Sequence, residues 1–244
     1  MTLLGHVGEL WRYPVSSMGG ERLDLAEIGA GGVAGDRVWD VVDTRDGTVA
    51  GPEKRRHWRP LPNLFSRQGE EGPEIGRGDG TWLPVASADA RELLSAFLGF
   101  PATLVPHGAQ EGDQVAPRYV RSGLHVLTTA SMDELGRLLG NPSEIDTRRF
   151  RPNIVVKTLP GLEGFAEHGF VGQTLSIGGV RTSVSEPCAR CAFTSLAQGN
   201  LAFEPAVLHR IAQHGDGGFG VRCTVEAAGE IKLGDEVRLE ADAR

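Results

Sequence analysis

Closely spaced alternation of apolar and polar residues runs through the first 85 residues and predicts short strands. Apolar content favours strands over residues 7–13 and 38–42, and strict alternation favours another over 23–28. A glycine-rich turn at 29–32 and an Asp46-Gly47 hairpin turn separate them. Strands at this spacing indicate a small barrel or sandwich.

Helical spacing of apolar residues begins at Ser87, a good N-cap, and continues over residues 87–98, with Gly99 as the stop. A second helix is predicted to begin at Ser131, with Glu134 completing a capping box and Gly140 ending the helix. The rest of the chain is again rich in strands, and a third helix is expected over 205–213. The further strands are predicted over 124–127, 153–157, 180–184, 218–226 and 236–240.

The length of 244 residues fits two domains, and 34 glycines with 14 prolines leave room for few long helices. We therefore expect a β-rich α+β fold. A small N-terminal barrel-like domain would span residues 1–86, a linking helix 87–98, and a second β-barrel domain with a few helices 99–241.

Charge and composition exclude several classes of protein. With 32 acidic against 25 basic residues, the net charge of −7 argues against a dedicated nucleic-acid-binding protein. No apolar run approaches the roughly 18 residues that span a bilayer, and no leader segment is recognisable. Three cysteines form no disulfide framework, so a reducing cytoplasm is the expected compartment.

The sharpest chemical motif is Pro187-Cys188-Ala189-Arg190-Cys191, in which Pro187 is expected to follow a strand and stiffen a turn. Arg190 places a cation beside Cys191 and favours its thiolate, which is both a nucleophile and a soft metal ligand. Three other interpretations compete with this one. The thiols could be two buried cysteines near a turn, half of a zinc site completed by Cys223 and histidines, or a thioredoxin-like redox pair.

Four further segments could bind an anion. Three arginines lie in residues 148–153, just before a strand, and arginine suits phosphate through its bidentate fork. Residues 13–20 combine two serines with two glycines that can expose backbone N–H groups, and residues 35–39 place a charged pair after a glycine turn. Residues 54–59 form a basic run in an acidic chain. Each is equally compatible with an ordinary turn or a solvated surface.

In this order, the motifs resemble those of the MOSC proteins, named after the C-terminal domain of molybdenum-cofactor sulfurase, and the subgroup with an N-terminal β-barrel domain that includes the amidoxime-reducing component. The resemblance covers nearly the whole chain. It rests on L-W-R-Y-P-V-S-S at 10–17, G-D-R-V-W at 35–39, R-F-R-P-N-I-V at 149–155, C-A-R-C at 188–191, F-G-V at 219–221 and G-E-I-K-L-G-D-E-V at 229–237.

The resemblance implies binding of molybdenum cofactor, a pterin dithiolene with a terminal phosphate, and not of pyridoxal phosphate. Cys191 would supply the thiolate ligand to molybdenum and act as the catalytic residue, since soft thiolates suit this metal. The positions that match cofactor-contacting residues of the family are Ser17, Arg37, Ser122, Arg151, Asn153 and Arg190. The sequence departs from the family where Ser16 replaces a lysine and where residues 193–200 lack its T-x-D-P-x-T-G pattern.

The function implied is that of a molybdenum-dependent oxidoreductase, which reduces small N-hydroxylated or N-oxide substrates by oxygen-atom transfer. Three cysteines provide no iron–sulfur cluster, so the electrons would come from a separate ferredoxin- or cytochrome-like protein. One alternative is a carrier of molybdenum cofactor, or of sulfur as a persulfide on Cys191. A relative that has lost the cofactor and binds another ligand is a third.

Overall fold

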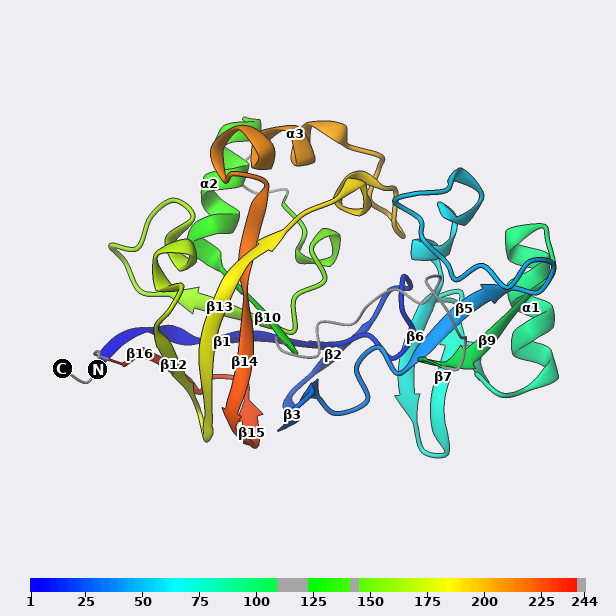
Figure 1. Ribbon diagram of the computed structural model, residues 1–244, viewed down its shortest axis with the longest axis horizontal. Helices are drawn as coiled ribbons and strands as arrows, with labels where there is room; N and C mark the ends of the chain where they lie inside the picture. Colours follow the sequence, from blue (N-terminus) through cyan, green and yellow to red (C-terminus); the bar gives the residue numbers. More distant parts are fainter. Residues whose placement is uncertain (109–122, 141–144, 241–244) are drawn as a thin grey trace.

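A computed structural model describes residues 1–108, 123–140 and 145–240. Seven strands form a closed barrel, because β1 pairs with β16 on one side and with β11 on the other (Figure 1). The strands around the barrel are β1 (Thr2–Arg12), β11 (Ile154–Thr158), β10 (Leu124–Thr128), β14 (Gly218–Ala227), β13 (Val180–Ala189), β12 (Thr174–Ile177) and β16 (Glu236–Leu239). The β-rich α+β fold predicted from the sequence is therefore confirmed.

Alternating side chains fill the barrel interior. Val7 and Leu10 of β1 pair with Val156 and Ile154 of β11, and all four side chains are buried in one core. Between Val7 and Glu9 the register shifts by a bulge, which rotates the strand so that both of its halves keep apolar residues inside. β2 (Glu21–Leu23) extends the sheet beyond β1.

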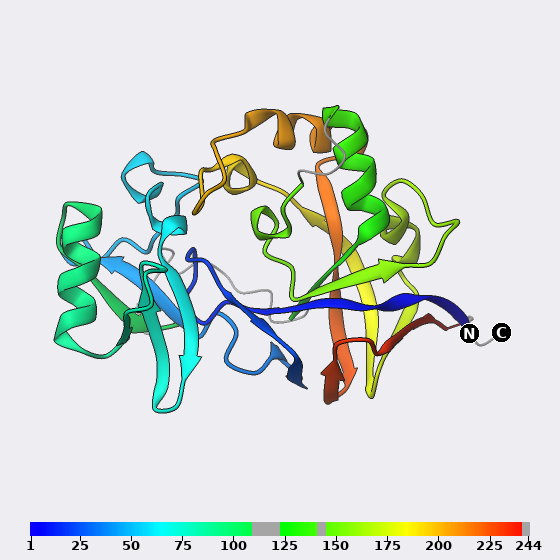
Figure 2. The same ribbon diagram turned by 180° about the vertical axis from the view of Figure 1, so that it is seen from behind.

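A second region packs around its own core, beside the barrel (Figures 1 and 2). Trp58, which lies in the basic run at 54–59, is fully buried there. This region contains β5 (Trp39–Asp43) paired with β9 (Ala102–Pro106), the sheet of β6 (Phe65–Gly69), β7 (Gly72–Gly76) and β8 (Trp82–Pro84), helix α1 (Ala88–Leu98), and the 3-10 turns η1 (Arg56–Trp58) and η2 (Leu61–Asn63).

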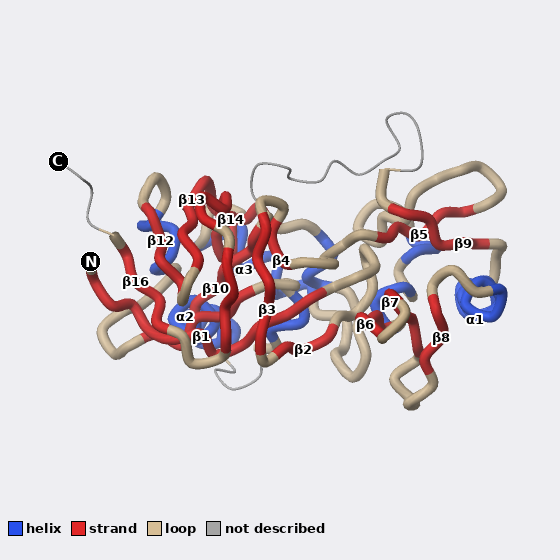
Figure 3. The backbone as a smooth tube through the Cα atoms, turned by 90° about the horizontal axis from the view of Figure 1, so that it is seen from below, coloured by secondary structure: helices blue, strands red, loops and turns tan. Residues whose placement is uncertain are grey.

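Each core draws on segments that are far apart in the chain, and the predicted domains at 1–86, 87–98 and 99–241 stay a prediction. β1 is a barrel strand, and β3 (Leu25–Gly29) and β4 (Gly32–Val33) join β15 (Gly229–Lys232) in a small sheet that packs on the barrel core. β9 instead pairs with β5. Strand pairing, and not order along the chain, thus decides which residues share a core. Figure 3 shows the barrel strands and the β5–β9 pair at opposite ends of the molecule.

Helices α2 (Thr129–Leu139) and α3 (Pro205–His214) lie side by side over one end of the barrel (Figure 2). The expected stop signals are confirmed, because Gly99 and Gly140 are both left-handed C-caps. Ser87 caps α1 as predicted. The predicted cap of α2 is wrong: Thr128 accepts from the Ser131 N–H, and the Ser131 hydroxyl instead donates to the buried carboxylate of Glu167.

Three further 3-10 turns connect these elements: η3 (Thr147–Arg149), η4 (Ala166–Phe170) and η5 (Ala192–Ser195). None of the helices within the described residues is both long enough and apolar enough to cross a membrane.

An ion-pair cluster beside β16 makes stability sensitive to acid. Arg181 and Ser176 hydrogen-bond Glu240 and lower the pKa of its carboxyl from 4.5 to about 2. Because the pKa is lowered in the folded state, this stabilisation is present above pH 4.5 and is lost as the pH falls towards 2. We expect acid unfolding of Arg181→Gln to show a shallower loss of stability across this range. Arg210→Gln, which removes a contact to neutral Gln213, should behave as wild type, and equal slopes for all three proteins would contradict the prediction.

Candidate functional site

The C-x-R-C segment closes the end of β13 and leads into η5, where it places its two thiols differently. Cys188 lies in the strand and is buried, whereas Cys191 follows the strand and is exposed. The carbonyl of Cys191 accepts from the N–H and the hydroxyl of Thr194, which fixes the backbone below the exposed thiol. Cys191 is therefore accessible to a ligand or cofactor from solvent.

Pro187 lies within β13 and not after it, which corrects the sequence prediction. The pairing of β13 with β14 shifts register on both sides of this residue, between Val184 and Glu186 and between Pro187 and Ala189. Irregularities of this kind accommodate a residue that has no N–H to donate to a neighbouring strand. They let the strand run on to the cysteine motif.

Arg190 points its guanidinium away from the exposed thiol and into the protein. Nη1 donates to the Cys188 Sγ at 3.1 Å, and Nη2 donates to the Phe150 carbonyl at 2.8 Å. Its Nε is buried and has no hydrogen-bond partner among the described residues. The sequence predicted that Arg190 favours a thiolate at Cys191, but the hydrogen bond that the structure contains goes to Cys188.

Arg151 is half-buried just before β11, with its Nη2 atom buried, and the segment 13–20 packs against it. Its Nη1 donates to the Met18 carbonyl, and its Cζ lies 4.2 Å from the centroid of the Tyr13 ring. Burial and the neighbouring Arg37 cation lower the pKa of Arg151 to about 9. Its Cζ is also 5.4 Å from the centroid of Phe193, two residues after Cys191, which links this arginine to the cysteine motif.

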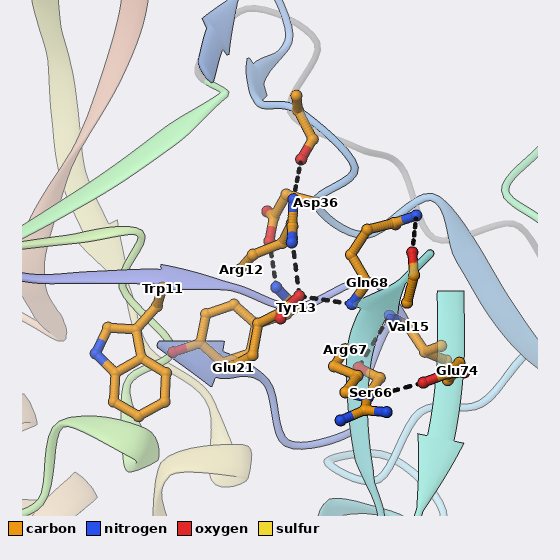
Figure 4. Close-up of polar contacts among 12 residues, drawn as sticks. Trp11, Arg12, Tyr13, Val15, Glu21, Asp36, Ser66, Arg67, Gln68 and Glu74 are labelled. Atoms are coloured by element: carbon orange, nitrogen blue, oxygen red, sulfur yellow. Dashed lines mark hydrogen bonds and ion pairs between the residues drawn. The ribbon is translucent and has the colours of Figure 1, made fainter. Parts of the chain in front are cut away.

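Arg37 joins the same cluster from the other predicted segment. Nη1 pairs with Asp36, Nη2 donates to the Arg151 carbonyl at 3.0 Å, and Cζ lies 5.1 Å from the Tyr13 centroid. The Tyr13 N–H donates to the Asp36 carboxylate at 2.7 Å, which fixes the end of β1 to this turn (Figure 4). Two predicted cofactor-binding arginines thus lie on one aromatic ring.

Strained backbone marks three of the predicted positions. Among the residues that the structure describes, four that are not glycine have a positive φ, and three of these are Ser17, Arg37 and Arg151 at 67°, 51° and 52°. The fourth is Asp216. Such conformations typically cost about 1–3 kcal/mol and cluster where function requires a particular geometry. These three residues are among the positions that the family resemblance implies for cofactor binding, which stays a prediction.

The segment 13–20 is anchored from the side of β6. Val15 donates its N–H to the Ser66 hydroxyl at 3.2 Å, and that hydroxyl donates to the Gly19 carbonyl at 3.0 Å (Figure 4). Glu21 accepts from Arg12 and from the Gln68 N–H. The second core therefore holds the turn that carries Ser17 against the barrel.

A small cavity of about 20 Å³ lies between these segments. Three buried polar groups that line it have no hydrogen-bond partner within the described residues: the Tyr13 hydroxyl, Arg151 Nη2 and Gln198 Nε2. Buried donors without partners are rare and costly, so they indicate a missing ligand or water. Arg148 also lines the cavity, together with Gly19, Gly20, Pro62, Phe65 and Gly199. A space of this size holds about one water molecule, and its unpaired N–H and O–H donors would reach a larger anion only if the lining side chains moved apart.

Asn153 is fully buried at the start of β11, and its amide is hydrogen-bonded to backbone. Oδ1 accepts from the His125 N–H at 3.1 Å, and Nδ2 donates to the Trp11 carbonyl at 3.4 Å. It therefore ties together β10, β11 and β1. Its predicted contact with cofactor stays a prediction, as does that of Ser122, which lies outside the described residues.

Tyr13 and Gln198 were not predicted as site residues. Tyr13 was visible inside the Y-P-V motif, but Gln198 lies in a stretch that departs from the family pattern and carries no signal of its own. The zinc alternative finds no support in residues 1–108, 123–140 and 145–240, which contain no group of three or more histidine, cysteine, aspartate or glutamate side chains suited to a metal.

Comparisons with known proteins agree with this architecture. A family model described as the MOSC domain matches residues 107–238, and one described as the MOSC N-terminal beta barrel domain matches residues 4–62. The crystal structure of the YUAD protein from Bacillus subtilis is similar at 13% identity, covering 97% of this chain and 96% of that one, with a TM-score of 0.54. The YiiM structure from Geobacillus stearothermophilus covers 50% of this chain and 55% of its own at 18% identity, with a TM-score of 0.38. No curated protein matches the sequence.

Proposed function

Because the chain belongs to the MOSC domain family, we propose that it binds molybdenum cofactor and acts as an oxidoreductase on small N-hydroxylated or N-oxide substrates. The observation that supports this proposal is the group of three unpartnered buried polar groups, from Tyr13, Arg151 and Gln198. Donors of this kind fit an anionic group, since each would gain the partner that it lacks. The Arg151 guanidinium also contacts Phe193, which lies two residues after the exposed Cys191.

The residues of the chain would bind the cofactor in complementary ways. Arg151 supplies a half-buried positive charge, Arg190 carries a buried Nε–H with no partner among the described residues, and Arg37 hydrogen-bonds the carbonyl of Arg151. Ser17, Ser122 and Asn153 remain proposed contacts. When bound, the cofactor supplies two-electron oxygen-atom transfer, and a separate electron-donor protein renews its electrons. The Cys191 thiol is the soft ligand that the chain offers to the metal.

A second function is favoured by the exposure of Cys191. An accessible thiol could bear a persulfide, which would make the protein a carrier of sulfur or of the cofactor. The two functions differ in turnover. An enzyme reduces N-hydroxylated compounds repeatedly with an artificial electron donor, whereas a carrier exchanges its cargo stoichiometrically.

The test is the molybdenum and pterin content of protein produced in a host that makes the cofactor, compared between wild type, Cys191→Ser and Cys223→Ser. We expect wild type and Cys223→Ser to hold both components. Cys191→Ser should retain pterin with less molybdenum per pterin, because the arginine contacts remain while one soft ligand is lost. Absence of both components from folded wild type would overturn the proposal.

A further inference from the structure

Cys188, the buried cysteine of the motif, lies close to several polar and charged side chains. Cys188 is only 3% exposed, yet its sulfur accepts from Arg190 Nη1 at 3.1 Å, and the His125 imidazole lowers the pKa of its thiol. The other groups that act on it electrostatically are Arg222 and the neighbouring thiol of Cys223. Two cationic side chains and an imidazole thus surround a single buried sulfur.

His125 is held for this contact by β14. Its Nε2 lies 3.2 Å from the Phe219 carbonyl. Gly220, at φ 76°, leaves room for the ring, because a Cβ at this position would lie 2.3 Å from Nε2. Only glycine combines that backbone conformation with that approach. β14 therefore fixes the imidazole beside Cys188.

Cys223 shows what burial does without these partners. Cys223 lies on β14, opposite Val184 of β13. Burial raises the pKa of its thiol to about 12. Burial also raises the pKa of Cys188, but the charges of His125 and Arg190 outweigh it and lower the pKa to about 5. The pKa values of the two buried thiols of one barrel are thus shifted in opposite directions.

We propose that Cys188 is a positioning residue: its sulfur pairs with Arg190 and fixes the guanidinium so that the unpartnered Nε–H is held ready for a bound anion. Nη1 is bonded to Cys188 and Nη2 to the Phe150 carbonyl, and only the buried Nε lacks a partner. The thiolate also compensates the cation inside the protein before any ligand arrives. This role rests on the proposed function for the identity of the anion.

The charge state is tested without any cofactor, by the ultraviolet absorbance of thiolate during a pH titration of the full-length chain carrying Cys191→Ala. We expect a step near pH 5 that disappears when Cys188→Ser is added and persists when Cys223→Ser is added instead. Adding Arg190→Gln should raise the midpoint by about one pH unit or more, since the cation favours the thiolate. The absence of an absorbance step below pH 7, or a midpoint that Arg190→Gln leaves unchanged, would overturn the inference.

The positioning effect is tested by pterin content. Cys188→Ser keeps a small polar side chain but removes the charge, and we expect it to retain about 10-fold less pterin, in line with loss of one charge-assisted contact. Cys188→Asp keeps the negative charge and should restore most of the binding. Pterin retention by Cys188→Ser equal to wild type would refute the role. If wild type itself holds no pterin, the proposed function fails, and the thiolate titration still decides the charge state of Cys188.

Discussion

Replacing Arg151 with methionine is expected to lower bound pterin and molybdenum together, by about 10- to 100-fold, because a charge-assisted hydrogen bond contributes about 1.5–3 kcal/mol. Arg151 is half-buried, carries a buried Nη2 with no partner among the described residues, and has its pKa lowered to about 9 by burial of the guanidinium and by Arg37. Such a group costs free energy in the protein without ligand and gains a partner when an anion binds. Metal and pterin analysis of the purified variant measures the loss.

Stability provides the internal check on Arg151→Met. Methionine removes the donor to the Met18 carbonyl as well as the cation, so we expect the cofactor-free variant to unfold at a lower temperature than the cofactor-free wild type, and cofactor content is measured on folded protein. Arg148→Met is the matched control, because Arg148 lines the same cavity but is already paired with Asp146 at 2.6 Å and with Asn200 at 2.9 Å. We expect the control to change cofactor content by less than about twofold, as is usual for a partly exposed ion pair. Equal losses in both variants would argue against a special role for Arg151.

Replacing Asn153 with leucine is expected to lower the free energy of unfolding by about 2–4 kcal/mol, since each buried backbone group left without a partner costs about 1–3 kcal/mol. The two groups concerned are the His125 N–H and the Trp11 carbonyl, which lie on β10 and β1. Urea unfolding of the cofactor-free protein measures this loss. Asn200→Leu serves as the control, because Asn200 is exposed and accepts only from Arg148 among its described contacts.

The same variant separates two interpretations of Asn153. The family resemblance assigns it to the cofactor, whereas the hydrogen bonds of the structure join three barrel strands. A folded Asn153→Leu with unchanged unfolding free energy but no pterin would show that the cofactor contact is its main role. Reduced stability with pterin retained in the folded fraction would show the reverse.

Local sequence signals predicted the elements well where one signal had no competitor. Ser87, Gly99 and Gly140 act as the caps that their residue types favour. The signal failed at α2, where Thr128 and Ser131 could both cap the helix. Burial of Glu167 beneath them decided between the two, because the carboxylate takes the Ser131 hydroxyl and leaves Thr128 for the helix N–H groups. That carboxylate lies more than thirty residues away and is invisible to a local pattern.

The sequence likewise indicated some residues of the candidate site and missed others. Motifs named Ser17, Arg37 and Arg151, which share a left-handed backbone that no motif encodes. The cavity itself was not predictable, because its unpartnered donors come from three distant segments, at Tyr13, Arg151 and Gln198. Which thiol the Arg190 side chain contacts depends on the direction of its guanidinium relative to β13. Cys191 is the cysteine nearest to Arg190 in the sequence, but the spacing of residues does not tell where the side chain points.

The place of β1 between β16 and β11 has a consequence for how the protein is made. Thr2 pairs with Leu239, so the barrel can close only after β16, more than two hundred residues after β1, has been synthesised. Pairings so distant in the chain carry a large loop-closure entropy and slow folding. Until then β1 keeps an open edge, along which nascent chains can associate. We therefore expect the yield of folded protein in cells to depend on chaperones and on the speed of translation more than its equilibrium stability would suggest.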